Sequence, residues 1–170
     1  MNNDAQPSVF QSILLDTDGT VTDLIGHIVG EQIHITKLSQ EIVTADEPEP
    51  LELPAPTQLL HRTILLSGAA QHFLFAESFF VIERMSDYLR RELLESQVPI
   101  GLLWQQEKLE TFREILQQGR ENCAALREYF SDINSDQFFT RSYRVFHHGA
   151  PLGVITEKFP VEYFVTGQAV

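Results

Sequence analysis

The sequence predicts an α+β fold, in which a single antiparallel β-sheet of about six strands is covered by helices and flap loops. Segments with the alternating apolar and polar residues of a β-strand occur mostly in pairs joined by short turns. The helical patterns are grouped between these pairs and do not alternate with single strands, as they would around a parallel sheet. The chain has 170 residues, 43% of them hydrophobic, which is enough for one core. We therefore expect one domain over residues 1–170, with residues 1–11 as a flexible tail.

The first half of the chain shows both periodicities. Val21, Leu24 and Ile28 recur at helical spacing, whereas Ile33 and Ile35 alternate as in a strand. The segment that follows is rich in proline and acidic residues, which favours an exposed loop or flap. In order, we expect helices at 7–15 and 19–30, a strand at 32–39, this loop at 44–57, and a hairpin formed by 59–67 and 72–82.

The second half begins with an amphipathic helix at 86–97, for which Ser86 is the expected N-cap. A short helical turn at 99–104 follows. Residues 109–118 fit either a helix or a strand, and we assign a strand because the sheet needs a further member. A helix at 122–130 and a hairpin at 138–160, with its turn at 148–151, complete the chain.

Glu157 is predicted to lie on a buried face of this last hairpin. Because side chains of a strand alternate between its faces, Glu157 shares a face with Ile155 and Phe159. An ionised carboxylate in such surroundings costs free energy unless a cation pairs with it or a ligand binds to it. Arg62 lies among apolar residues of its own strand with the same period. The two residues suggest a dry pocket with a charge at either end. The alternatives are a structural salt bridge, or strands whose other face is the core.

Composition excludes several functions. The formal net charge of −12 disfavours binding to nucleic acids or to anionic membranes. Neither a signal-peptide pattern nor an apolar segment of membrane-spanning length is present, so we expect a cytoplasmic protein. The one cysteine, Cys123, lies in a helical pattern and is expected to pack as a small residue. The six histidines lack the carboxylate or thiolate neighbours of a zinc site, so no metal is expected.

Residues 13–23, ILLDTDGTVTD, resemble the first motif of haloacid dehalogenase-type phosphatases. In that family the two aspartates, here Asp16 and Asp18, are the nucleophile and the acid/base beside magnesium. The chain has no Gly-Asp or Asp-Asp pair to complete the metal site, and its hairpins contradict the parallel sheet that this family needs. The alternative is a polar turn between two helices, with Thr17 or Asp18 as the cap of the second.

A second resemblance covers residues 12–164 and is to the chorismate–pyruvate lyase family, whose members convert chorismate to 4-hydroxybenzoate and pyruvate. Five similar blocks occur in the family's order: ILLDTDGTVTDLI, then LLHRTILLSG followed by FLFAESFFVI, then VPIGLLW, EILQQGR and PLGVITEKFP. The resemblance implies a monomeric lyase of quinone biosynthesis with a chorismate lyase-like fold. It also implies chorismate as substrate, with neither cofactor nor metal.

Position by position, the resemblance implies roles for four residues. Arg62 matches the arginine that binds the ring carboxylate, and Glu157 matches the acid at the oxygen end of the aromatic product. Ile100 matches the position that closes over the ring, and Thr20 matches a backbone contact to the ligand. The same architecture is shared with effector-binding domains of transcription regulators. A non-catalytic domain that binds an aromatic acid is therefore the alternative to a lyase.

Overall fold

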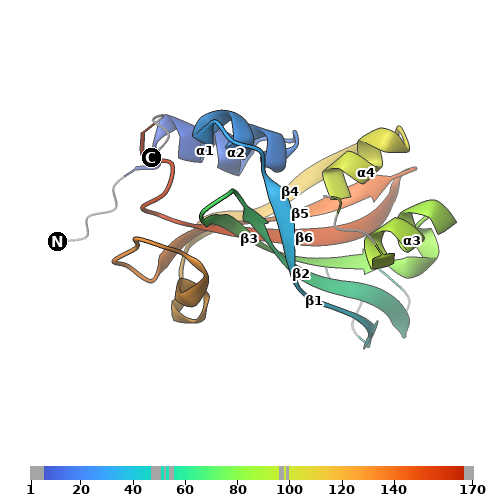
Figure 1. Cartoon of the computed structure of the whole chain (residues 1–170). Coiled ribbons are helices and arrows are strands. Elements are labelled where there is room, and N and C mark those ends of the chain that lie inside the picture. Colours follow the sequence, from blue (N-terminus) through green and yellow to red (C-terminus); the bar gives the residue numbers. More distant parts are fainter. Residues whose placement is uncertain are drawn as a thin grey trace.

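A computed structural model describes residues 6–46, 51, 53, 56–95, 98 and 100–166 (Figure 1). Within these residues the chain forms six β-strands, four α-helices and two short 3-10 helices. In chain order they are α1 (Val9–Asp16), α2 (Val21–Val29), β1 (His34–Ala45), β2 (Thr57–Ser67), β3 (His72–Val81), η1 (Ile82–Arg84), α3 (Asp87–Glu95), α4 (Ile100–Gln106), β4 (Thr111–Asn122), η2 (Ala124–Tyr129), β5 (Gln137–His147) and β6 (Ala150–Pro160).

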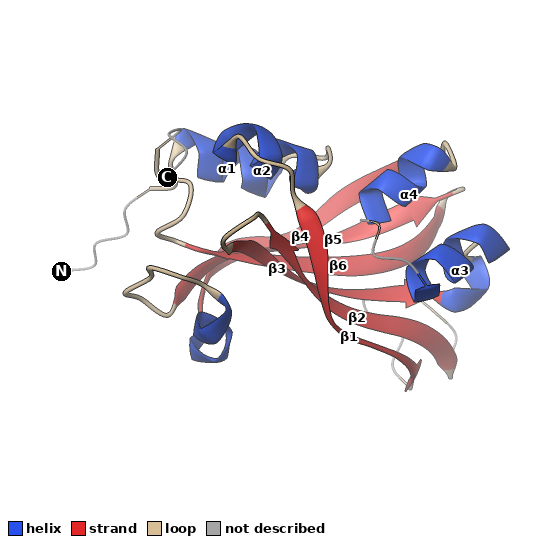
Figure 2. Cartoon of the chain, in the orientation of Figure 1, coloured by secondary structure: helices blue, strands red, loops and turns tan. Residues whose placement is uncertain are grey.

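The six strands form one sheet in the order β1-β2-β3-β6-β5-β4, and every neighbouring pair is antiparallel (Figure 2). The last strand, β6, thus lies between β3 and β5. The predicted α+β class is confirmed, and so is the strand assigned near residues 109–118. The turn between β5 and β6 is tighter than predicted, because His147 pairs with Ala150 and only two residues lie between them. Both His148 and Gly149 have positive φ, at 51° and 73°, which matches the twist of a two-residue hairpin.

The two faces of the sheet are covered differently. On one face, which we call the inner face, α1 and α2 cover one end and α3 and α4 cover the other (Figure 1). Each pair of helices packs on its own apolar cluster. On the opposite face, η2 packs on Leu65 and Phe138, while Leu51 and Leu53 pack on Leu59. Burial of both faces explains the nearly continuous apolar runs of the central strands.

Three predicted boundaries were wrong. Strand β1 runs to Ala45, well beyond residue 39, because a bulge between Lys37 and Ser39 lets its polar second half continue the pairing with β2. Inside the predicted exposed loop 44–57, Leu51 and Leu53 are buried, while residues 47–50, 52 and 54–55 lie outside the described residues. The predicted helix at 122–130 begins as the end of β4 and continues as η2.

The predicted tail is packed from residue 8 onward. Ser8 caps α1 in a capping box with Gln11. The buried side-chain amide of Gln11 donates to the carbonyl oxygens of Val161 and Tyr163, at 2.9 and 2.7 Å. These bonds tie the beginning of the chain to the segment after β6. The cap at Ser86 is confirmed, since its Oγ accepts from the Leu89 amide at 3.0 Å.

The segment 16–20 is a turn between α1 and α2. The N-cap of α2 is Thr20, not Thr17 or Asp18, and its side chain makes no capping hydrogen bond. A phosphatase of the haloacid dehalogenase type needs a parallel sheet behind this motif, and the antiparallel sheet excludes that interpretation. Among the described residues, no cluster of histidine, cysteine and acidic side chains is placed to hold a metal ion. The same residues include no helix that is long and apolar enough to cross a membrane.

Candidate functional site

A cavity lies on the inner face of the sheet, between the two pairs of helices. Its floor is formed by β2, β3, β6 and β5, and its roof by the start of α2 and the start of α4. The roof closes where Thr20 meets Gly101, because a Cβ atom on Gly101 would lie 3.3 Å from the Thr20 Cγ2. The empty space, counted together with the open mouth, is about 600 Å³.

The structure brings all four sequence-predicted site residues to this one cavity. Arg62 and Glu157 rise from the floor, and Thr20 and Ile100 lie in the roof. The remaining lining is largely apolar. It consists of Val21, Thr22, Ile35, Ile64, Leu66, Leu74, Ala76, Ser78, Gly101, Trp104, Arg113, Tyr143 and Ile155.

Arg62 is a buried cation with no carboxylate partner among the described residues. Its side chain is 2% exposed, and it forms none of the ion pairs among the described residues. Its Nε and Nη2 have no hydrogen-bond acceptor there either. Burial lowers the pKa of the Arg62 guanidinium to about 10, which leaves it charged at neutral pH. The alternative of a structural salt bridge between Arg62 and Glu157 was therefore wrong.

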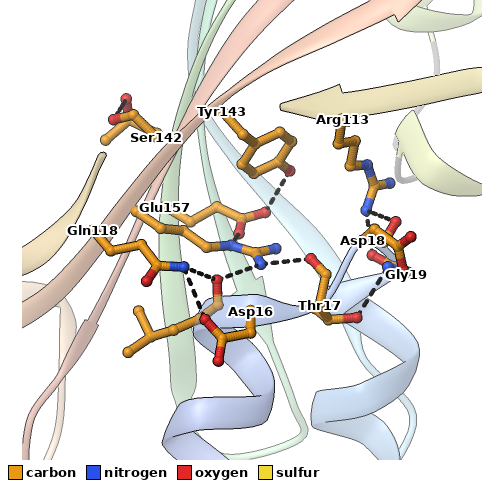
Figure 3. Close-up of polar contacts among 12 residues, drawn as sticks. Asp16, Thr17, Asp18, Gly19, Arg113, Gln118, Ser142, Tyr143 and Glu157 are labelled. Carbon is orange, nitrogen blue, oxygen red and sulfur yellow. Dashed lines mark hydrogen bonds and ion pairs between the residues drawn. The ribbon is translucent and has the colours of Figure 1, made fainter. Parts of the chain in front are cut away.

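The partner of Glu157 is Arg141, its direct neighbour across the β5–β6 pair. Arg141 Nε lies 2.6 Å from Glu157 Oε2, and the Tyr143 hydroxyl donates to Oε1 at 2.9 Å (Figure 3). All three residues are buried. An ionised carboxylate offers about four lone-pair positions, so Glu157 keeps room for a ligand that donates a hydrogen bond.

Arg141 also holds the turn after α1 against the sheet. Its Nη1 donates to the carbonyl oxygens of Leu15 and Thr17, at 3.1 and 2.8 Å. A cation at the C-terminal end of a helix satisfies carbonyls that have no partner within the helix. Burial acts to lower the pKa of the Arg141 guanidinium, but the charge and hydrogen-bond interactions with Glu157 and Tyr143 together outweigh burial, and the pKa is raised.

Tyr143 is a neutral donor at this site. Burial raises the pKa of its phenol far above the ordinary value, and the charge of Glu157 adds to the effect. Tyr143 therefore stays protonated at any physiological pH and serves to fix the orientation of the Glu157 carboxylate.

Arg113, from β4, is a second arginine of the cavity lining. Its Nη1 donates to the carbonyl oxygen of Asp18 at 2.7 Å and to that of Gly19 (Figure 3). Its guanidinium lies 5.6 Å from the ring centroids of both Trp104 and Tyr143, within the range of cation–π attraction. Its Nε is buried and has no acceptor among the described residues.

The unpaired polar atoms around the cavity are all donors. They are Arg62 Nε and Nη2, Arg113 Nε, Trp104 Nε1 and, beside the cavity, Arg141 Nη2. Buried polar atoms are nearly always satisfied, so a group of unpaired N–H donors indicates a place for a ligand rich in acceptors. Two of the arginines, Arg62 and Arg113, have no acidic partner in the part of the chain that the structure describes, so this ligand is expected to be an anion.

Sequence reasoning missed three of these residues. Arg141 and Tyr143 share a face with Phe139 at a period of two, so their burial was detectable from the same pattern that revealed Glu157. Arg113 lies in the segment that fits both a helix and a strand, and no local pattern assigns it to the cavity.

The fold defines the class of the protein. It is similar to the effector domain of PhnF from Mycobacterium smegmatis, with a TM-score of 0.63, 12% identity and coverage of 91% of each chain. It is also similar to a GntR-family transcriptional regulator from Bacillus cereus, with a TM-score of 0.60, 13% identity and coverage of 78% of this chain and 94% of the other. These similarities define the class as an α+β fold with a single six-stranded antiparallel sheet.

The sequence comparisons identify the family. The model of the family described as "Chorismate pyruvate-lyase Rv2949c-like" matches residues 15–165, and the chain belongs to this family. The chorismate pyruvate-lyase of Mycobacterium leprae is 29% identical over 152 residues, which are 86% of this chain and 72% of that protein. The chorismate pyruvate-lyase of Mycobacterium tuberculosis strain H37Rv is 27% identical over 156 residues, covering 86% and 77%.

Proposed function

We propose that this protein is a chorismate lyase, which eliminates pyruvate from chorismate to give 4-hydroxybenzoate for quinone biosynthesis. The observation that carries the proposal is the position of Arg62, a buried arginine that pairs with no acid of the described segments and lies in the same cavity as Glu157. Family membership supports the assignment, since the relatives described above are named chorismate pyruvate-lyases.

Arg62 binds the ring carboxylate of the substrate. A guanidinium presents two parallel N–H groups to a planar carboxylate, and two buried nitrogens of Arg62 are unpaired. The apolar side chains beside it, Ile64 and Leu66, exclude water and so strengthen the ion pair. Ile100 and Thr20 close the roof over the ring.

Glu157 acts at the other end of the ring. Its carboxylate accepts a hydrogen bond from the ring hydroxyl, while Arg141 and Tyr143 hold it in place. The ether bond between the ring and the enolpyruvyl group then breaks. The hydrogen on the ring carbon that bears the hydroxyl leaves, the ring becomes aromatic, and the enolpyruvyl methylene gains a hydrogen to become the methyl group of pyruvate.

The reaction is balanced without an external oxidant or reductant. All atoms of chorismate are found in 4-hydroxybenzoate and pyruvate, and aromatisation makes the step downhill. The protein therefore contributes a fixed substrate conformation and preorganised charges.

Purified protein incubated with chorismate in the presence of EDTA tests the proposal. We expect 4-hydroxybenzoate and pyruvate in equal amounts, at a rate that EDTA does not change. A different aromatic product, or chorismate decay no faster than in buffer, would refute it.

The second candidate is a non-catalytic domain that binds an aromatic acid. The similarity of the fold to domains of GntR-family regulators favours it. A binder would show a thermal shift with 4-hydroxybenzoate and release no pyruvate from chorismate, whereas a lyase would show both effects.

A further inference from the structure

The cavity carries two positive charges that no acidic side chain of the described residues neutralises. Arg141 neutralises Glu157 within one ion pair. Arg62 and Arg113 remain, and neither forms an ion pair among the described residues. Lys37 is a further cation close to Arg62. Burial lowers the pKa of its amine, and the positive charge of Arg62 lowers it further. A ligand with two negative charges would match this arrangement, whereas a monoanion would leave one arginine without a partner.

The two arginines lie at opposite ends of the cavity. Arg62 belongs to β2 and Arg113 to β4, with β3, β6 and β5 between them. At the usual strand spacing this places their backbones roughly 19 Å apart along the sheet. Both side chains reach the same cavity, so a single-ring molecule with acidic groups at two ends can contact both.

The contacts of Arg113 hold its guanidinium in a fixed orientation, which favours the binding of an anion. Two carbonyl oxygens hold its Nη1, and the rings of Trp104 and Tyr143 flank the guanidinium. These contacts fix the planar group of a residue that lines the cavity, and its Nε has no acceptor among the described residues. Neighbouring Trp104 Nε1 is a second unpaired donor. A carboxylate has two acceptor oxygens and would satisfy both donors.

We infer that Arg113 binds the second carboxylate of a dianionic ligand, and that the site thereby selects dianions over monoanions. The inference rests on the proposed function, in which the second carboxylate belongs to the enolpyruvyl side chain. Arg62 then binds the ring carboxylate. Cleavage divides the dianion into two monoanions, so neither product alone engages both arginines.

Two probes separate the two arginines. One is 4-hydroxybenzoate, a monoanion. The other is 3-(1-carboxyethoxy)-4-hydroxybenzoate, an aromatic dianion that keeps the ring hydroxyl and in which a lactyl ether replaces the neighbouring enolpyruvyl ether. Their dissociation constants can be measured by calorimetry for the wild type and for Arg113→Gln, Arg113→Lys and Arg62→Gln. Arg91→Gln is the matched control, because Arg91 is an exposed residue of α3 far from the cavity lining.

Arg113→Gln keeps hydrogen-bond donors for the two carbonyls and removes the charge. We expect it to weaken binding of the dianion about 30-fold or more, the lower end of the effect of truncating a buried charge pair. Binding of the monoanion should change less than about threefold, which also shows that the cavity is intact. Arg113→Lys should keep most of the preference for the dianion. Arg62→Gln should weaken binding of both probes, and Arg91→Gln should affect neither.

Equal losses for both probes in Arg113→Gln, or no loss for either, would overturn the inference. Because the dianion probe cannot release pyruvate, this result does not depend on lyase activity. If the wild type forms no 4-hydroxybenzoate, the proposed function fails, yet the ratio of the two dissociation constants still decides the role of Arg113. With an active enzyme, Arg113→Gln should raise KM for chorismate more than it lowers kcat.

Discussion

Glu157 and Arg62 were both predicted to be charged residues on an apolar face of a strand, but their surroundings in the structure differ. Glu157 is matched by Arg141 and Tyr143, whereas Arg62 has no counter-charge among the described residues. Burying an unpaired ion costs free energy, and burying a well-paired one costs much less. We therefore expect Arg62 to destabilise the ligand-free protein and an anionic ligand to relieve this cost, an arrangement that is common at functional sites.

This difference predicts opposite effects of two similar substitutions on the ligand-free protein. Arg62→Met removes an uncompensated charge and keeps the apolar stem, so the free energy of unfolding should stay the same or rise. Arg141→Met leaves Glu157 without its partner, so the free energy of unfolding should fall by about 3–5 kcal/mol. Thermal or urea unfolding of both variants measures this. A loss of stability in Arg62→Met as large as that in Arg141→Met would show that Arg62 has a structural partner.

Arg62 should also dominate ligand binding. Arg62→Ala is expected to weaken binding of 4-hydroxybenzoate by about 2–5 kcal/mol, the range for truncating one member of a buried charge pair. Arg62→Lys should recover little, because a single ammonium cannot reproduce the two parallel N–H groups. Titration calorimetry gives both values. Wild-type affinity in Arg62→Ala would exclude Arg62 as the carboxylate anchor.

Glu157→Gln tests the proposed role of the acid. The amide keeps the shape and one acceptor but removes the charge, so kcat should fall by about 10²–10⁴ while product binding falls much less. Some loss of stability is also expected, because Arg141 loses its counter-charge. Tyr143→Phe is the control, since it removes one hydrogen bond to Glu157 and keeps the carboxylate. Near wild-type turnover by folded Glu157→Gln would mean that Arg62 and the cavity walls are sufficient.

At the scale of elements, the roof over the cavity depends on the contact between α2 and α4. Gly101 in α4 approaches the side chain of Thr20, the N-cap of α2, so closely that an added Cβ would lie 3.3 Å from Thr20 Cγ2. Neither helix is long, and each holds its position mainly through its own apolar cluster. A small outward shift of α4 would therefore open the cavity without unfolding the sheet.

Gly101→Ala should weaken binding of 4-hydroxybenzoate, because the new methyl group pushes the two helices apart. In a Thr20→Ala background the same change should have a smaller effect, since Cγ2 is absent. A double-mutant cycle on the dissociation constants measures this coupling, which we expect at about 0.5 kcal/mol or more for residues in contact. Strictly additive effects would show that the contact between Thr20 and Gly101 does not control how closely the roof covers the ligand.

The elements also show what the sequence could reveal. The period of two placed Arg62 and Glu157 on buried faces of their strands, and the helix cap at Ser86 was read from residue type alone. The pairing of Glu157 with Arg141 could not be derived, because it depends on β5 being the neighbour of β6 in a fixed register. Arg113 joins the cavity through β4, whose exposed residues carry no strand-like alternation. Neighbour relations between strands are non-local, and a single sequence carries little information on them.

At the scale of the whole molecule, the charge of the surface opposes the charge of the cavity. The chain has a formal net charge of −12, yet the proposed substrate is a dianion. Of the arginines proposed to attract it, Arg62 is buried and Arg113 is half-buried, so we expect their field to be felt mainly inside the cavity, and the surface field to act first on an approaching ligand. We therefore expect the acidic surface to slow the association of an anionic ligand, and the arginines of the cavity to provide the affinity for it.

This arrangement predicts an unusual dependence on salt. Raising the ionic strength from about 0.01 M to 0.15 M shortens the Debye length from about 30 Å to 8 Å. This change screens the exposed carboxylates of the surface far more than the arginines inside the cavity. The association rate constant of 4-hydroxybenzoate, measured by stopped-flow, should therefore rise severalfold with salt. The uncharged 4-hydroxybenzamide is the control and should show no such change. An association rate that falls with added salt would mean that the field of Arg62 and Arg113 reaches the mouth of the cavity and dominates the acidic surface.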